Sequence, residues 1–189
     1  MTEEEILAKF ASKFPKIEKA KAAIKSYLTL QLPCAADLTA VVSWMKSELG
    51  FDYLDMINAV DWKGPLSLDG FVRDPNPNVF LPEGATPQID APTPTAGVAY
   101  REAFELTYCL TNFSAGRKIF LKFDVPRAKP EVPSLTGLYK AADWQEREIF
   151  DLLGVFFAGH PNLRKILTPE FIAGHPLRKD YVHVKDKYD

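Results

Sequence analysis

Hydrophobic residues alternate with polar ones in several short segments of this chain. A period of two is typical of β-strands that bury one face. The last two segments are separated only by a short polar stretch from Asn112 to Gly116, so they predict a β-hairpin. The strand-like segments are 27–32, 51–62, 104–110 and 119–125.

Other segments have the three-to-four-residue spacing of an amphipathic helix. Thr2 and Glu5 form a capping-box pattern at the start of one of them. Asp37 is placed to cap a second, whose apolar stripe ends before Gly50.

Two more helices are predicted in the C-terminal half. Ser134 starts a short one that runs to Lys140, and Asp143 caps another that has Glu146 in its first turn. Gly154 lies where a glycine commonly ends such a helix. Prolines then recur every seven or eight residues, which leaves no room for a further helix.

Prolines also interrupt the middle of the chain. Seven of the fifteen prolines lie within residues 63–99, which are therefore predicted to form a long loop. The pattern as a whole predicts an α+β domain over 1–153, with a mixed sheet of about four strands and flanking helices. An extended partner-binding arm follows over 154–189. The arm has little of its own to fold on, so we expect it to become ordered on a partner.

Composition excludes several classes of protein. The chain has 189 residues, of which 47% are apolar, so it can bury a core. Its net charge of -2 argues against a nucleic-acid partner. No apolar run approaches the roughly 18 residues of a membrane span, and the acidic N-terminus lacks the pattern of a secretory signal, so a cytoplasmic location is expected. The two cysteines, Cys34 and Cys109, form no C-x-x-C pair, which argues against a cysteine-bound cluster or zinc ion.

The helix predicted over 144–153 carries two distinct stripes of side chains. The stripe that is expected to pack on the domain consists of Glu146, Ile149, Phe150 and Leu153. The other stripe consists of Trp144, Arg147, Glu148 and Asp151.

Four interpretations of this second stripe are open. It could be a solvated face with a local salt bridge between Arg147 and Asp151. Carboxylates and histidines could hold a metal ion, or Glu148 with His160 could act in acid–base catalysis, although no ligand spacing or nucleophile motif supports either. The fourth interpretation is an interface in which arginines meet the carboxylates of a partner protein. The residues available to a metal-dependent hydrolase are Glu148, Asp151, His160 and His175.

Two near-copies of one phrase follow this helix. They read Gly-His-Pro-Asn-Leu-Arg-Lys over 159–165 and Gly-His-Pro-Leu-Arg-Lys over 174–179. This segment is too charged for a core and too apolar for a loose tail. Its composition therefore favours a surface that binds another protein. The predicted interface residues are Trp144, Glu146, Arg147, Glu148, Asp151, His160, Arg164, His175, Arg178, Lys179 and Asp180.

This region resembles the signature of a known family. The family is the 30 kDa subunit, also called the C subunit, of respiratory complex I, the proton-pumping NADH:quinone oxidoreductase. The run from Gly174 to Asp180 is similar to the family's second phrase, and the resemblance covers about two thirds of the chain. The residues that match the first phrase are Glu146-Arg147-Glu148, Asp151-Leu152-Leu153, His160, Arg164 and Ile166-Leu167.

The resemblance implies a non-catalytic structural subunit of the peripheral arm, on the cytoplasmic side of a bacterial cell membrane. Its expected partner is the D subunit, which helps to form the quinone pocket and is named the quinone-site subunit below. The chain would meet the membrane only through the complex. NADH, FMN, iron–sulfur clusters and quinone would belong to other subunits, and this chain would bind no cofactor. Similar subunits occur in membrane-bound hydrogenases and in the photosynthetic complex I-like enzyme, which stay alternatives, as does an adaptor of some other assembly.

Overall fold

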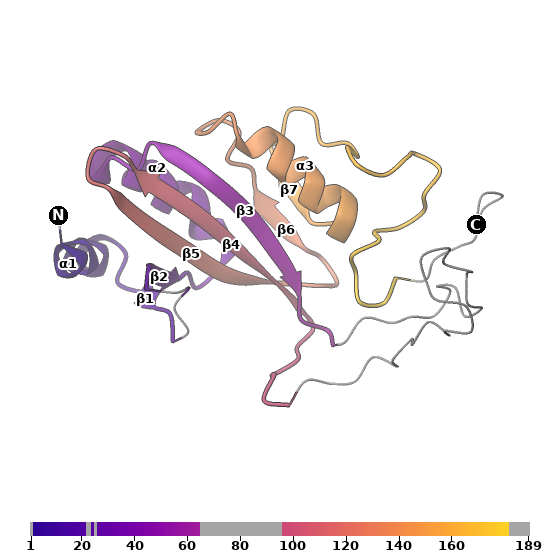
Figure 1. Cartoon of the computed structure of the whole chain (residues 1–189), viewed down its shortest axis with the longest axis horizontal. Helices are drawn as coiled ribbons and strands as arrows, with labels where there is room; N and C mark the ends of the chain where they lie inside the picture. The colour runs from indigo at the N-terminus through magenta and orange to yellow at the C-terminus, as the bar shows by residue number, and fades with distance from the viewer. Residues whose placement is uncertain (1, 22–23, 25, 65–95, 182–189) are drawn as a thin grey trace, which may run out of the picture.

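The computed structural model describes residues 2–21, 24, 26–64 and 96–181 (Figure 1). Two helices and a five-stranded sheet form one end, and a third helix with two short strands lies at the other. The elements are α1 (Glu3–Lys13), β1 (Glu18–Lys19), β2 (Leu28–Gln31), the 3-10 turn η1 (Ala35–Asp37), α2 (Leu38–Leu49), β3 (Tyr53–Asp61), β4 (Ala103–Asn112), β5 (Arg117–Pro126), β6 (Glu131–Pro133), α3 (Ala142–Leu153) and β7 (Phe156–Ala158).

The main sheet has the strand order β1-β2-β5-β4-β3. β4 and β5 form the predicted hairpin, in which Leu106 is opposite Phe123 and Leu110 is opposite Ile119. β3 and β1 are antiparallel to their neighbours, whereas β2 runs parallel to β5. The predicted α+β fold with a mixed sheet is confirmed. Its fifth strand, β1, has only two residues and is too short to show an alternation in the sequence.

The face of the sheet that α2 covers forms the core (Figure 1). Gly50 ends α2 in the left-handed conformation with φ of 71°, and the Asn112 side chain donates to the carbonyl of Leu49 at 2.7 Å. The predicted cap by Asp37 is wrong: η1 precedes the helix, and the Asp37 carboxylate accepts a hydrogen bond from the Cys34 thiol instead. The buried side chains of α2 are those of Leu38, Val41, Val42, Met45 and Leu49.

α1 begins with the predicted capping box. The Glu5 N–H donates to the Thr2 hydroxyl, and the Glu5 carboxylate accepts from the Thr2 N–H. Phe10 is buried and meets Trp44 of α2 edge to face, with 5.0 Å between ring centroids. The first helix therefore packs on the second.

α3 lies beside β3, where the Gln145 side chain accepts a hydrogen bond from the Ile57 N–H. It ends at Gly154 as predicted, but its N-terminal residues carry no side-chain cap, so the predicted cap by Asp143 is wrong. The short helix predicted from Ser134 is also absent: residues 134–140 form turns. A tertiary contact takes its place, because the Glu146 carboxylate of α3 accepts hydrogen bonds from the Ser134 hydroxyl and the Leu135 N–H.

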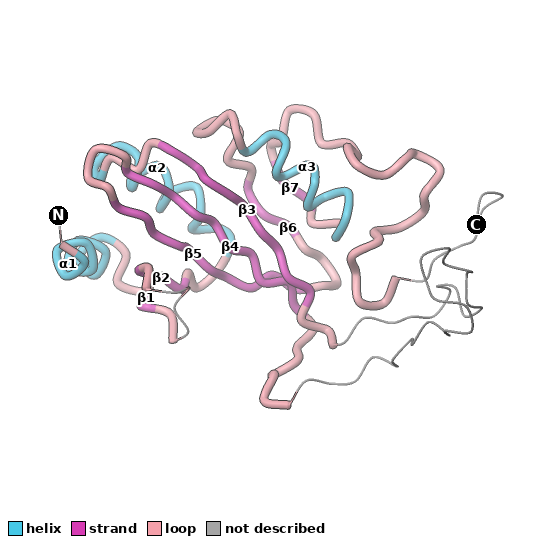
Figure 2. Tube along the Cα trace, in the orientation of Figure 1, coloured by secondary structure: helices cyan, strands magenta, loops and turns pink. Residues whose placement is uncertain are grey.

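β7 pairs in parallel with β6 and buries Phe157. The extended part of the chain therefore begins after β7. We name residues 159–181 the strap. Figure 2 shows it as a loop that passes α3 and returns toward the end of the main sheet. No helix or strand forms in the strap, as its prolines predict. Of the predicted loop 63–99, residues 65–95 lie outside the described residues.

Candidate partner interface of the third helix and the strap

Asp151 of α3 fastens the middle of the strap. One carboxylate oxygen accepts hydrogen bonds from the N–H groups of Ile166, Leu167 and Thr168 at 2.8–2.9 Å. The other oxygen accepts from the Thr168 hydroxyl. Burial raises the pKa of Asp151, but these bonds outweigh it and lower the pKa to about 2. The carboxylate is therefore ionised and acts as a fixed anchor for three consecutive amides.

The two histidines of the repeated phrase also bind α3. The Asn162 N–H donates to Nδ1 of His160, so the proton of this ring lies on Nε2, which donates to the carbonyl of Asp143 at 3.1 Å. His175 places Nδ1 at 2.8 Å from the carbonyl of Asp151. A Cβ on Gly154 would lie 2.5 Å from the His175 ring, so only glycine allows this approach.

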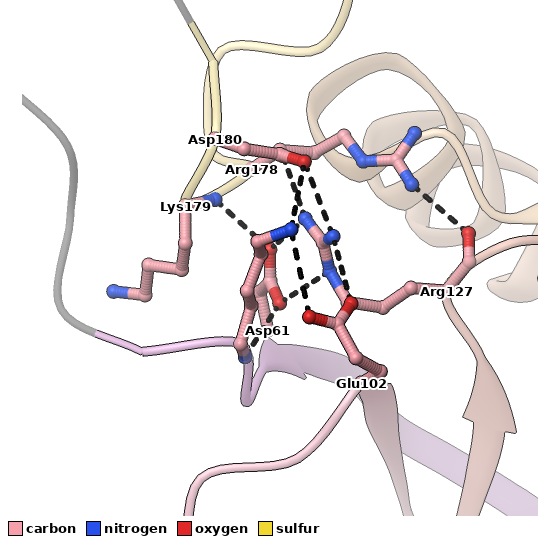
Figure 3. Close-up of polar contacts among 7 residues, drawn as sticks. Asp61, Glu102, Arg127, Arg178, Lys179 and Asp180 are labelled. Carbon is pink, nitrogen blue, oxygen red and sulfur yellow. Dashed lines mark hydrogen bonds and ion pairs between the residues drawn. The ribbon is translucent and has the colours of Figure 1, made fainter. Parts of the chain in front are cut away.

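The end of the strap is held by an ion cluster at the end of the main sheet (Figure 3). Arg127, which follows β5, forms two bonds of 2.8 Å with the Asp61 carboxylate of β3 and a further bond of 2.6 Å with Asp180. The Lys179 N–H donates to Asp61 at 2.9 Å. The Arg178 guanidinium donates to the Arg127 carbonyl at 3.1 Å. Asp61 of β3 thus binds Lys179 of the strap, and Arg127 after β5 binds Arg178 and Asp180.

The charges of this cluster depend on one another. Burial lowers the pKa of Arg127, but its bonds to Asp180 and Asp61 outweigh burial and raise it. The bond from Arg127 lowers the pKa of Asp180 to about 2. The Asp61 side chain is only 1% exposed, so its bonds to Arg127 replace contacts with water.

Glu146 has a different role, inside the body of the domain. It has no exposed surface, and its two oxygens accept from the Ser134 hydroxyl at 2.6 Å and from the Leu135 N–H at 2.7 Å. Burial raises its pKa to about 7, since these two bonds do not compensate for desolvation and the neighbouring Asp143 charge adds to it. Its carboxylate joins α3 to the chain that leads from β6.

This shift predicts a pH dependence that Glu146→Gln abolishes. The folded state holds the Glu146 proton up to about pH 7, whereas the unfolded chain releases it near pH 4.3, so stability falls as pH rises between these values. The glutamine amide keeps an acceptor for Leu135 and adds a donor for Ser134. We expect the wild type to lose about 3 kcal/mol of unfolding free energy relative to this variant between pH 4 and 8.

Urea unfolding of both proteins at pH 4 and pH 8 measures this difference. Glu148→Gln is the control, because Glu148 is exposed on the same helix. A wild-type-to-variant difference that is equal at both pH values would show that burial does not shift the Glu146 pKa.

The sequence of this chain is clearly similar to sequences of known proteins. The family described as "Respiratory-chain NADH dehydrogenase, 30 Kd subunit" matches residues 34–187. This chain belongs to that family. The NADH-quinone oxidoreductase C subunit of Moorella thermoacetica is 51% identical over 80 residues, which are 42% of this chain and 54% of that protein. The C subunit of Herpetosiphon aurantiacus is 33% identical over 146 residues, or 76% and 65% of the two chains.

Two solved structures share the fold of this family member. A trypsin-resistant fragment of Nqo5 superposes with a TM-score of 0.55 at 23% identity, covering 85% of this chain and 98% of the fragment. A chain of the membrane-bound sulfane sulfur reductase, an archaeal respiratory membrane complex, superposes with a TM-score of 0.60 at 22% identity, covering 98% and 94%. The chain spans about half the length of the first curated relatives.

The structure divides the predicted interface residues of this family member into two groups. One group is used inside the chain, to hold α3, the strap and the sheet together. It consists of Glu146, Asp151, His160, His175, Arg178, Lys179 and Asp180. The other residues reach the surface of α3 or the strap: Trp144, Glu148 and Arg164 are exposed, and Arg147 is mostly buried. For this second group a partner contact stays a prediction.

The arrangement does not favour the metal or hydrolase interpretations. Asp151, His160 and His175 direct their polar atoms at backbone groups of the chain itself. Within the described residues, no three His, Cys, Asp or Glu side chains are grouped so that they could hold a metal ion. The salt bridge between Arg147 and Asp151 that the solvated-face interpretation includes is not formed, because Arg147 faces Asp143, one turn earlier on the helix.

Sequence reasoning missed the residues that anchor the strap to the sheet. Asp61 and Arg127 are 66 positions apart, and each appears only as a polar residue at the end of a strand. Thr168, which binds Asp151, lies in a bend without a motif. The only available signal was the change from an alternating strand to a charged residue at Asp61 and Arg127.

Proposed function

We propose that this chain is a structural, non-catalytic subunit of a proton-pumping NADH:quinone oxidoreductase, and that α3 and the strap dock on the quinone-site subunit. Membership of the complex I subunit family supports the assembly. The specific observation that supports the docking face is a set of large apolar side chains exposed on α3 and the strap. They are Trp144 (66% exposed), Leu167 (59%), Phe171 (68%) and Leu177 (54%).

These side chains are held in place rather than left on a loose tail. The backbone of Leu167 is bound by Asp151, and the Leu177 N–H donates to the carbonyl of Leu152 at 2.9 Å. The strap therefore has more contacts with the domain than expected of a segment with little of its own to fold on, and its ordering on a partner stays a prediction. A preorganised apolar surface binds with a smaller ordering cost, which suits a permanent contact between subunits.

The remaining parts of the proposal follow the family. NADH, FMN, iron–sulfur clusters and quinone would be bound by other subunits, and the chain would lie in the peripheral arm on the cytoplasmic side. Within the described residues no helix is long and apolar enough to cross a membrane. The names of the curated relatives favour this oxidoreductase over a hydrogenase-like assembly, since the likeness to the sulfane sulfur reductase concerns the fold alone.

Co-purification tests the proposal. A tagged chain purified from detergent-solubilised membranes should bring with it the quinone-site subunit and NADH:quinone reductase activity. Replacing Leu167 and Phe171 together with alanine is expected to lower the recovery of that partner at least tenfold, because truncating two anchors of an interface commonly costs about 1–2 kcal/mol each. Thermal unfolding should stay unchanged, since both side chains are mostly exposed.

Phe113→Ala is the matched control. Phe113 is 64% exposed, but it lies in the β4–β5 turn, at the other end of the sheet from the strap (Figure 1). Its loss should leave the recovery of the quinone-site subunit unchanged. A wild-type chain that is purified without other respiratory subunits, or equal losses from both variants, would contradict the proposed function.

A further inference from the structure

Arg147 is buried but has few hydrogen bonds. The residue is 9% exposed, and its Nε donates to the carbonyl of Arg164 in the strap at 3.2 Å. Its guanidinium carbon lies 5.6 Å from the centre of the Trp144 ring. The side chain is therefore fixed between α3 and the strap, with an exposed tryptophan next to it.

The terminal nitrogens of this guanidinium have no hydrogen-bond acceptor among the described residues. Nη1 is 3.9 Å from the nearer Asp143 oxygen, which is too far for a hydrogen bond. That oxygen also lies 3.5 Å from Nε2 of His160. The Arg147 side chain is 11% exposed, and neither Nη atom is among the fully buried side-chain atoms that lack a partner.

The other buried arginine shows what a completed site looks like in this chain. Arg127 directs its nitrogens at the carboxylates of Asp61, Asp180 and Glu102. Of the five N–H groups of Arg147, by contrast, one has an acceptor in the described part of the chain. A guanidinium removed from water in this way is stabilised strongly by a carboxylate that meets both terminal nitrogens.

We propose that Arg147 is a docking seat for a carboxylate of the partner protein, an Asp or Glu side chain that binds the two Nη atoms beside the Trp144 ring. This inference rests on the proposed function and adds the chemistry of the contact. Opposite charge and fork geometry select the carboxylate, and the Trp144 ring shields the pair from water. Tryptophan and arginine side by side are also the composition of an interface hot spot.

Arginine modification in the unaltered protein tests the seat. The free chain and the detergent-purified complex are treated with phenylglyoxal, which reacts with accessible guanidinium groups, and modification of Arg147 is followed by mass spectrometry. We expect modification at Arg147 to be at least tenfold slower in the complex than in the free chain. Arg117, at the far end of β5, should react equally in both. Equal rates at Arg147 would overturn the seat.

A cross-linking experiment identifies the partner's group. Arg147→Lys keeps the positive charge and replaces the guanidinium with an amine, which a carbodiimide joins to a carboxylate in direct contact. In the purified complex, a link from this position to an Asp or Glu of another subunit is the expected result. A link only to Asp143 or Glu148 of the same chain, with the complex intact, would show that the arginine is purely structural.

The two proposals fail in different ways. If the Arg147→Lys chain keeps its melting temperature but no longer recovers the other subunits, the fork is required and the seat is supported. If the wild-type complex forms while Arg147 stays fully reactive, the seat is wrong and the proposed function stands. If the wild-type chain recovers no other subunit, both are wrong.

Discussion

Replacing Arg127 with methionine is expected to lower the free energy of unfolding by about 3–5 kcal/mol. The methionine keeps much of the apolar stem but removes the guanidinium, whose carbon lies 5.4 Å from the centre of the Phe104 ring. Among the described residues, Asp61 would then hold a buried carboxylate with backbone donors alone, since Lys179 and Lys63 offer it only their N–H groups. Breaking one side of a buried pair is costly because the remaining charge stays out of water.

Chemical denaturation of the wild type, Arg127→Met, Asp61→Asn and the double variant measures this effect as a double-mutant cycle. The double variant should be more stable than Arg127→Met alone, because the buried carboxylate at Asp61 is then also removed. Lys129→Ala is the control: Lys129 is 86% exposed and forms a single 3.5 Å pair with Glu131, so its loss should cost little. Equal costs for Arg127 and Lys129 would contradict a structural role of the ion cluster.

The parts of the fold that local pattern determines were predictable from the sequence. The hairpin of β4 and β5 and the stripe of α2 follow from apolar periodicity, because a buried face must repeat with the geometry of its element. Helix ends that need a left-handed residue were also correct, at Gly50 and Gly154. These features depend on residues within about one turn of each other.

The predictions that failed concern polar side chains with a choice of partners. Asp37 and Asp143 have the right chemistry for a cap, but neither caps its helix. Ser134 also has the right chemistry for a cap, yet its hydroxyl binds Glu146 twelve positions away. A sequence shows which hydrogen-bonding groups exist, but tertiary packing decides which of them meet. For this reason the anchors of the strap could not be predicted.

The family resemblance identified α3 and the strap as the important region. It did not show which of their residues hold the chain together and which lie on the surface. Of the signature residues, Asp151 and Glu146 hold the chain together from inside, whereas Arg164 stays exposed, as does the neighbouring Trp144. A residue that anchors the chain internally and a residue on the surface cannot be told apart from the sequence, because both are charged or aromatic residues at helical spacing. Only the burial and the hydrogen bonds of each side chain show whether it holds the chain together or lies free at the surface.

The strap is attached to the domain at several points along its length, and this explains how a segment without helix or strand keeps its shape. Asp151 binds its middle, His175 contacts the end of α3, and Asp180 binds Arg127. The lengths of chain between these anchors are short, so releasing one point frees only part of the strap. Each anchor should therefore have its own local stability, below that of the core.

Asp151→Ala should release the middle of the strap while the core stays folded. The variant removes the acceptor of three backbone N–H groups and a hydroxyl, bonds to a charged group that are worth about 1.5–3 kcal/mol each before water replaces part of them. A net loss of about 3–4 kcal/mol corresponds to a hundredfold to thousandfold faster amide exchange at residues 166–168. Exchange in the strands of the main sheet should not change.

The pH dependence gives the same test without a mutation. Because the folded-state pKa of Asp151 is about 2, its contribution is complete above the ordinary value near 3.9 and is lost as pH falls toward 2. Glu148→Ala removes an exposed acid from the same helix and should leave exchange at 166–168 unaltered. Since Leu167 belongs to the proposed docking face, Asp151→Ala should also weaken recovery of the quinone-site subunit without removing any exposed side chain. Wild-type exchange at 166–168 in that variant would mean that the strap is held by its other anchors alone.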